Sequence, residues 1–600
     1  MIYVVAEGTI PEFIAQPAAI GLFVPGAGGE VSREGAIASL RRGKVENGLL
    51  GGKPGGKILV NVVFGIPHQR VPQPIVYVEL PPPGHHPNTK RYGIAFVGAG
   101  YRGILTSEAT RIRGLVPIAD IAPTLIALQE GRAPPIDWQA DRHAAKHLRA
   151  LDRRLADIHR DRGWTLTAVV LAVLALSAAV PRAGVLGGAA AVAGSMLLSW
   201  AGATRLWLLI LGIVALTIGL AVAASARRRL VLVSVGIFFA AYLGVLTLSP
   251  ETNSLAVLGA RPDGGGRFYG MTNQVETLLL APLIVAAAVG GVRWLVPLGG
   301  LALLMVGWSK AGADGGGVLV FATALGVLAL RLRGLAASPR RVALLAAAVL
   351  VVALGLVGLD AALGGSSHVT RAVGAGPGSL LGDLGHRLHL SWESATEDWY
   401  RVVLFLGCLA ALVAMGSMRP RRATVDALLA ATGVSLLVND TPVDVIGLAA
   451  VGCAALIRWE SVDSRPMRRG VLTAACFLAA LALAGCGDQG IVAPTAKEVV
   501  GTVKQEAPGK ALFISIGCGA CHTYQPAGPE ANGKIGPDLD KLPDYAKAAK
   551  QPLATFVHDS IVDPGKYVQQ GFQNVMPKSY NTLAPADLQA LVDFLSKPQG

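Results

Sequence analysis

Hydrophobic and polar positions divide the sequence into three regions with different patterns. Short apolar runs alternate with polar segments in residues 1–162, long apolar runs fill 163–466, and ordinary polarity returns in 487–600. Short apolar runs between turn residues are typical of strands, whereas long ones favour helices. We therefore expect a multi-domain chain in which only the middle region is apolar throughout.

The first region, 1–162, is predicted to be a small α/β segment. Strand-like runs cover 57–64, 74–80 and 92–97, and a helical stretch follows at about 121–129. Strands and a helix in one segment predict a sheet with a helix packed on it.

The middle region, 163–466, contains about eleven apolar runs of ~16–22 residues, which is the length needed to cross ~30 Å of hydrocarbon. A polytopic all-α membrane domain is therefore expected, although one or two runs could be buried helices of a soluble core. The runs are centred near Leu171, Ala191, Ile213, Phe238, Val285, Leu303, Ala322, Val349, Ala410, Leu429 and Ala449.

Composition excludes an ordinary soluble protein. Hydrophobic residues make up 52% and charged residues 15% of the sequence, which is too apolar for a surface that faces water everywhere. The formal net charge is +14. Because Arg clusters stand at the ends of the apolar runs, we attribute this excess to membrane topology and expect no nucleic-acid partner.

The Arg clusters also predict which ends of the runs face the cytoplasm. They lie at 227–229, 331–341, 419–422 and 465–469. The longer loops then fall outside, together with residues 1–162. Since no signal peptide opens the chain, either the count of spans is wrong by one or the true start lies upstream.

A secretory signal is predicted inside the chain, at 467–486. A basic start precedes an apolar run that ends in Leu483-Ala484-Gly485-Cys486, as in signal peptides. These last residues resemble the lipobox of bacterial lipoproteins, which implies acylation of Cys486. The alternative is one more membrane span. The resemblance implies that 467–600 was or is an independent lipoprotein, and that the chain is a fusion or read-through of two genes.

Cys518, Cys521 and His522 form a C-x-x-C-H motif, the attachment pattern of c-type haem. Two thiols at this spacing can add to the two vinyl groups of the porphyrin, and the adjacent His can present its imidazole to the iron. Zinc would require a second pair of ligands, and a thioredoxin-type motif would require a βαβ unit. The surrounding sequence offers neither, so we expect one covalently bound haem c.

A second axial ligand is expected some fifty residues later. Met576 precedes Pro577 in a turn-like stretch after Gly571, whereas a Met that only fills a core usually lies on an apolar helix face. We favour Met576 and keep His558, in a predicted helix, as its rival. His/Met ligation raises the reduction potential and fills both axial positions, which favours electron transfer.

The order of these features resembles class I c-type cytochromes over about 505–597. The features are a helix at 509–517, the motif, Gly536-Pro537-Asp538-Leu539, Met576-Pro577 and a last helix at 583–597. The pattern is most similar to the cytochrome c domain fused to haem–copper oxidase subunit II. The copper domain of that subunit is missing, so we do not interpret the chain as an oxidase subunit. The resemblance implies an all-α domain in which the Pro537 carbonyl accepts the Nδ1 proton of His522.

Residues 92–128 are similar to the C-terminal end of the alkaline phosphatase and sulfatase superfamily. The similarity rests on strand-like 92–97, then Ile104 to Ser107, then a helix opened by Asp120-Ile-Ala-Pro-Thr. That superfamily works with metals held by clusters of Asp and His. We find no Asp-His pair of that kind in this segment. The candidate ligands are His68, His85 and His86. We interpret residues 1–162 as a truncated or metal-free remnant without assigned chemistry.

Polar residues at the ends of the apolar runs have two interpretations. One group comprises Arg267, Asn273 and Glu276. The others are Asp314 and the segment 439–441. Ionisable groups near the membrane are often functional, which would make them one shared site. Since each lies in or beside a predicted loop, we favour ordinary turns and helix caps.

These observations predict a membrane-anchored monohaem cytochrome of the cytoplasmic membrane, with its haem domain on the extracytoplasmic side. We expect an electron carrier of a respiratory chain rather than a catalyst, with a terminal oxidase or a quinol-oxidising complex as redox partner. One alternative is an envelope enzyme or transporter, residues 1–466, joined to a cytochrome c lipoprotein by gene fusion. Another is a redox sensor in which haem reports to the membrane domain.

Overall fold

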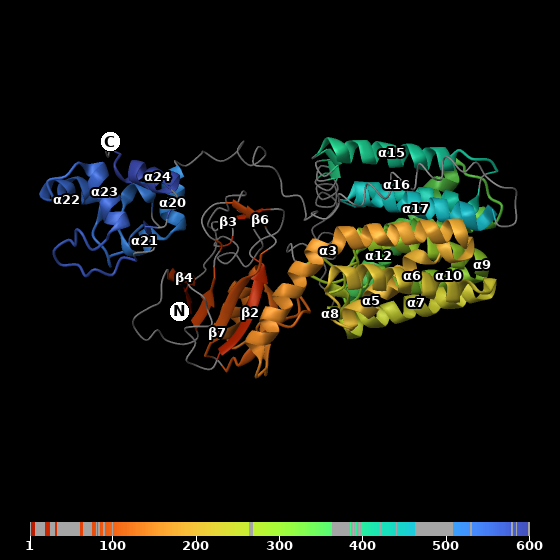
Figure 1. Ribbon diagram of the computed structural model, residues 1–600, viewed down its shortest axis with the longest axis horizontal. Coiled ribbons are helices and arrows are strands. Elements are labelled where there is room, and N and C mark those ends of the chain that lie inside the picture. Colours follow the sequence, from red (N-terminus) through yellow and green to blue (C-terminus); the bar gives the residue numbers. More distant parts are fainter. Residues whose placement is uncertain are drawn as a thin grey trace. The chain divides into compact units, whose positions relative to one another are not determined.

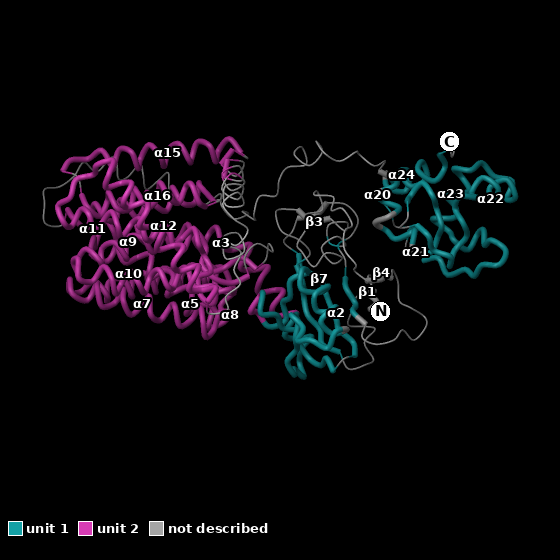
Figure 2. The backbone as a smooth tube through the Cα atoms, turned by 180° about the vertical axis from the view of Figure 1, so that it is seen from behind, with its two compact units in different colours: residues 1–109, 113–148, 493–600 teal, residues 110–112, 149–492 magenta. Residues whose placement is uncertain are grey.

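The computed structural model divides the chain into two compact units (Figure 2). The first comprises residues 1–109, 113–148 and 493–600, and the second comprises 110–112 and 149–492. The structure describes residues 2–5, 18–24, 30–32, 36, 60–63, 75–79, 81, 85–87, 90–98, 100–262, 268–362, 385, 388, 391–392, 395–396, 398–420, 422–439, 441–461, 508–528, 531–577, 580–581, 583 and 585–597.

A mixed sheet forms the N-terminal part of the first unit (Figure 1). Its strand order is β10-β8-β2-β7-β5-β1-β4, with β9 paired to β2. Neighbours β2 and β7 are antiparallel, whereas β1 lies parallel to both β4 and β5. The strands are β1 (Ile2–Val5), β2 (Ala18–Val24), β4 (Val60–Val63), β5 (Ile75–Val78), β7 (Tyr92–Val97), β8 (Gly103–Ser107), β9 (Leu115–Pro117) and β10 (Ile136–Gln139).

The sheet buries its apolar residues against the helix α2 (Ile121–Gln129). Phe23 of β2 and Phe96 of β7 are fully buried in the same cluster as Ile121. The expected strands at 57–64, 74–80 and 92–97 contain β4, β5 and β7, and the expected helix is α2. The small N-terminal sheet is therefore confirmed, while β2 and β8 were not predicted as strands.

The second unit is a helical bundle. Each of the eleven predicted run centres lies in one of its helices. The helices are α3 (Ala144–Ala179), α4 (Pro181–Gly184), α5 (Gly187–Trp200), α6 (Leu206–Ser225), α7 (Arg228–Leu248), α8 (Pro250–Ser254), α9 (Asn273–Gly290), α10 (Val292–Gly307), α11 (Gly315–Leu332), α12 (Pro339–Ala362), α15 (Trp399–Gly416), α16 (Ala423–Val438) and α17 (Pro442–Glu460).

Eight helices of the described residues are long and apolar enough to cross a membrane. Helices α5, α10 and α16 are apolar but shorter. This finding supports a membrane protein and matches the expected helix positions, although three of the eleven helices fall below the length of a full span.

Burial within the bundle is uneven. The apolar window of α17 is 83% buried and that of α9 is 78% buried, whereas the window of α12 is only 6% buried. Helix α9 packs against α5, α7, α11 and α17. It is therefore the central helix, and α12 lies at the periphery, in contact mainly with α11.

Small residues allow the central helices to approach closely, as is typical of membrane helices. A Cβ built on Gly188 of α5 would lie 2.9 Å from the carbonyl carbon of Leu278 in α9. The two backbones therefore touch at this point, and no larger side chain fits between them.

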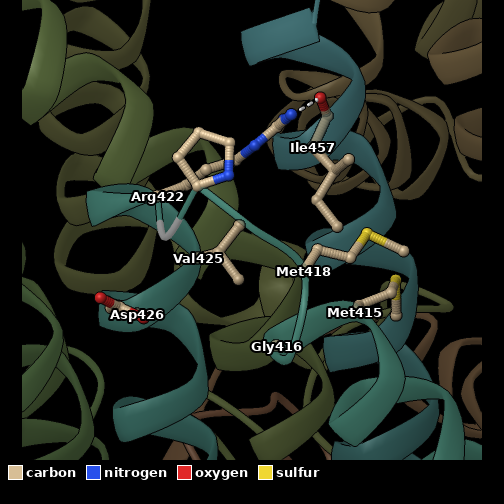
Figure 3. A pocket seen from close by; sticks show the side chains of 8 residues that line it. Met415, Gly416, Met418, Arg422, Val425, Asp426 and Ile457 are labelled. Atoms are coloured by element: carbon tan, nitrogen blue, oxygen red, sulfur yellow. Dashed lines mark hydrogen bonds between the residues drawn. The ribbon is translucent and has the colours of Figure 1, made fainter. Parts of the chain in front are cut away.

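A small pocket lies between α15, α16 and α17 (Figure 3). The Arg422 side chain donates from Nη1 to the Ile457 carbonyl at 2.6 Å. Asp426, the acidic residue of the pocket, pairs with Arg331 at 3.0 Å. The charged groups here are thus engaged within the chain. The lining residues are Met415, Gly416, Met418, Pro420, Arg422, Val425, Asp426 and Ile457.

The C-terminal part of the first unit is a small all-α domain. Phe513, Tyr524 and Phe594 form its aromatic centre, with ring centroids 5.4 to 5.9 Å apart. The helices expected at 509–517 and 583–597 correspond to α20 and α24. The helices are α20 (Pro508–Ser515), α21 (Cys518–Cys521), η7 (Gln525–Ala527), η8 (Leu539–Lys541), α22 (Leu542–Ala548), α23 (Leu553–Val562) and α24 (Pro585–Leu595).

Some predictions lie outside the described residues. They are the internal signal at 467–486 with Cys486, and the isolated candidates His68, Arg267 and Asp440. These remain predictions from sequence.

Replacing Gly188 with Ala should destabilise the bundle by about 1–3 kcal/mol, because the new Cβ would push α5 away from α9. The matched control is Gly219→Ala in α6, where a Cβ meets no atom within 4 Å. That change should leave stability unchanged or slightly higher, since Ala favours helices over Gly. Thermal unfolding of the detergent-solubilised chain measures both, and equal effects would contradict the close approach.

Candidate functional site

A single helical turn, α21, presents the two thiols of the C-x-x-C-H motif. Gly517 precedes it with φ of 80°, a left-handed conformation that glycine adopts at little cost. Cys518 and Cys521 stand three residues apart, so both side chains lie on one side of the turn. The turn ends at His522, whose backbone is extended and whose N–H donates to the Cys518 carbonyl at 3.0 Å.

His522 has a fixed orientation and a fixed tautomer. Its Nδ1 lies 2.7 Å from the Pro537 carbonyl oxygen. Because a carbonyl oxygen can only accept, the proton must be on Nδ1, which leaves the Nε2 lone pair available for a metal. The hydrogen bond that the sequence resemblance implied is therefore present.

The segment around Gly536 lies directly against the imidazole. A Cβ on Gly536 would lie 2.7 Å from Nδ1 and 2.8 Å from Nε2 of His522, so only glycine fits. The Gly536 N–H donates to the Cys521 carbonyl at 2.7 Å, which ties this segment to α21. Sequence reasoning singled out Pro537 and missed Gly536 as a positioning residue.

Burial sets the protonation states of the motif. It lowers the pKa of His522, partly offset by the hydrogen bond to Pro537, so the imidazole is neutral at pH 7 as a ligand must be. Burial also raises the pKa of Cys518 to about 12 and raises that of Cys521. Both cysteines are free thiols.

This donor set fits a c-type haem. It offers two unpaired thiols at the attachment spacing and one neutral imidazole whose Nε2 is unprotonated. Chemically, the thiols can form two thioether bonds and the imidazole one bond to iron.

Met576 is itself half-buried and lies in an irregular, mostly exposed segment after Gly571, whose φ is 91°. Its assignment as second ligand stays a prediction. Its rival His558 lies on α23 with 47% of its side chain exposed, and its Nδ1 is 3.3 Å from Asp559. An exposed ring paired with a neighbour on the same helix is a poor candidate for a buried axial ligand.

Tyrosines of the domain mainly support its packing. Tyr580 donates from its hydroxyl to the Ile516 carbonyl at 3.3 Å, which fixes the segment after Met576 against the end of α20. Tyr524 donates to the Phe594 carbonyl at 3.2 Å and joins the motif region to α24.

Of the N-terminal candidates, the structure describes His85 and His86, and they do not join a metal site within the described residues. His85 and His86 lie in the short strand β6 (His85–Pro87), which pairs with β3 (Glu30–Ser32). Ser107 donates to Asp120 at 2.6 Å, and burial raises the pKa of this carboxyl. Within the described ranges no three His, Cys, Asp or Glu residues gather as metal ligands. The resemblance to alkaline phosphatases stays unconfirmed.

Gly536→Ala should displace the His522 imidazole and alter haem ligation, because the new Cβ would overlap the ring. Its control is Gly509→Ala, whose Cβ would lie 2.9 Å from the Ala590 carbonyl carbon, between α20 and α24. Both variants should lose about 1–3 kcal/mol of stability, but only the first should change the absorption spectrum and reduction potential. If the Gly536→Ala and Gly509→Ala variants had the same absorption spectrum, the role of Gly536 in positioning His522 would be contradicted.

Comparison with known proteins identifies the C-terminal domain. A family model described as Cytochrome c matches residues 506–598. No curated protein and no solved structure matched the chain. The matched segment contains α20, the C-x-x-C-H turn, the Pro537 carbonyl and Met576. Residues 506–598 are therefore a domain of the cytochrome c family, consistent with a class I c-type cytochrome.

Proposed function

We propose that this chain is a membrane-anchored monohaem c-type cytochrome that carries single electrons on the outer face of the cytoplasmic membrane. The observation that carries the proposal is the half-buried, oriented imidazole of His522. Its Nδ1 is committed to the Pro537 carbonyl, and it directly follows two free thiols.

Four side chains would hold the cofactor. Cys518 and Cys521 would form the thioether bonds, and His522 and Met576 would be the axial ligands. A haem c bound there supplies one iron that alternates between two oxidation states. Pro537 keeps the imidazole oriented, and Gly536 allows the ring to approach the backbone. Because His522 and Met576 would both bind the iron, the chain would leave no position for oxygen, which favours electron transfer over oxygen chemistry.

Sidedness follows from the charges around the internal apolar run. Arg465, Arg468 and Arg469 precede the run 471–485, and no comparable basic cluster follows it closely. Such an asymmetry keeps the N-terminal side in the cytoplasm and delivers residues 487–600 outside. The redox partner would be a terminal oxidase or a quinol-oxidising complex on that face.

A second candidate function is a transporter or envelope enzyme formed by residues 1–466, joined to the cytochrome by gene fusion. It is favoured by the buried carboxyl group of Asp444 in the bundle, which is fully shielded from solvent. Electron transfer by the haem domain alone does not require such a group.

Met576→Ala should remove the weak red absorption band of thioether-ligated ferric haem and lower the reduction potential. The physical reason is that a soft, neutral thioether stabilises the ferrous state. His558→Ala is the matched control and should change neither property, because its ring is exposed on α23. If only the His558 variant lost the band, His558 and not Met576 would be the second ligand of the iron.

Protease added to intact spheroplasts should digest the haem domain, because the proposal places it outside. Haem staining of a denaturing gel follows the product, and a Cys518→Ala, Cys521→Ala double variant should show no stain. A stained band near the full mass of 61.8 kDa before digestion would show one polypeptide. Protection of the stained band from external protease would contradict the proposed sidedness.

A further inference from the structure

Helices α9 and α17 begin side by side at one end of the bundle, and polar side chains join their first turns. Gln274 Nε2 of α9 donates to Asp444 Oδ2 of α17. One residue earlier on α9, Asn273 Nδ2 donates to Thr441 Oγ1 at 3.1 Å. These contacts bring together residues that are some 170 positions apart in the sequence.

Asp444 is fully buried, with 0% of its surface exposed. One carboxyl oxygen is engaged by Gln274, but the other, Oδ1, has no hydrogen-bond partner among the described residues. A buried carboxylate oxygen without a partner is costly, because it has left water and gained nothing in return. A cation or a proton at Oδ1 would remove this cost.

Ordinary helix capping does not explain this carboxyl group. Asp444 lies in the first turn of α17, where an acidic side chain often accepts N–H groups of its own helix. Here Thr441, the N-cap residue, makes no side-chain capping bond, and the hydrogen bond to Asp444 comes from another helix. By contrast, Asp314 does cap its helix, accepting from Gly317 N at 3.0 Å.

We propose that Asp444 and Gln274 form a binding site for a small monovalent cation, either a proton or an alkali-metal ion. The cation neutralises the carboxyl group at Oδ1, while Gln274 holds Oδ2 in place. Thr441, linked to Asn273, supplies a hydroxyl oxygen at the same junction of α9 and α17.

The charge of the site sets the charge of the ligand. A divalent ion usually needs several carboxylates, and the part of the chain that the structure describes contains no group of three His, Cys, Asp or Glu residues. One carboxyl group with neutral amide and hydroxyl neighbours matches a single positive charge. A buried ionisable residue in a membrane bundle is also, by its cost, a candidate for function.

The charged groups on the helices packed against α17 lie either at the same end of the bundle as Asp444 or at the opposite end. At the same end, α9 carries Glu276, and the first turn of α15 carries Arg401, whose Nε lies 3.7 Å from Asp398. On α16, Asp426 lies at the opposite end and pairs with Arg331. Arg458 of α17 donates to the Ala178 carbonyl in the last turn of α3, also at the far end.

The test uses the purified full chain with its haem. Its melting temperature is compared in sodium, potassium and choline chloride at equal ionic strength, between about pH 5 and pH 8. A cation that binds only the folded state raises the melting temperature with its concentration. An alkali ion is the ligand if sodium or potassium stabilises relative to choline, and a proton is the ligand if only the pH matters.

Asp444→Asn should abolish this response, because the amide has no charge but still offers Gln274 an oxygen. Asp426→Asn is the matched control and should keep the response, since that carboxyl group is paired with Arg331. If the Asp444 variant fails to fold, Gln274→Leu decides, and it should shift the response to higher cation concentration. The proposal would be overturned if the melting temperature of the wild-type chain depended on neither the alkali cation nor the pH. It would also be overturned if the variants at 444 or 274 showed the same dependence as the wild-type chain.

Discussion

The hydrogen bond from His522 Nδ1 to the Pro537 carbonyl is the constraint on which the haem domain depends. It fixes the proton on one ring nitrogen and leaves the other for iron. It also requires the segment before Pro537 to pass directly over the ring, which is why residue 536 is glycine. The Gly536 N–H of the same segment donates a hydrogen bond to the Cys521 carbonyl. The imidazole of His522, the two thiols and the backbone that supports them are therefore positioned together.

Local patterns predicted local structure well. The apolar runs of the middle region each became a helix, because helix hydrogen bonds close within four residues and need no distant partner. The C-x-x-C-H motif behaved likewise, since its geometry is that of one turn. The family match at 506–598 agrees with the sequence interpretation of that segment.

Features that depend on distant partners were harder to predict. Strand β2 pairs with β7, β8 and β9, and its run of apolar residues does not reveal such neighbours. The pairing of Gln274 with Asp444 joins two helices that sequence spacing does not relate. Interpreting the polar ends of the runs as turns and caps was adequate for Asp314, but it overlooked Asp444 because burial becomes visible only after the helices pack.

The contrast between α12 and α17 has an evolutionary consequence. Only 6% of the apolar window of α12 is buried within the protein, whereas 83% of that of α17 is buried. In α12, exchanges among Leu, Val and Ile need only preserve hydropathy, so the sequence can drift with little effect. In α17, each exchange must also preserve volume. Among homologous chains, we therefore expect α12 to keep its composition while losing its identity, and α17 to keep both.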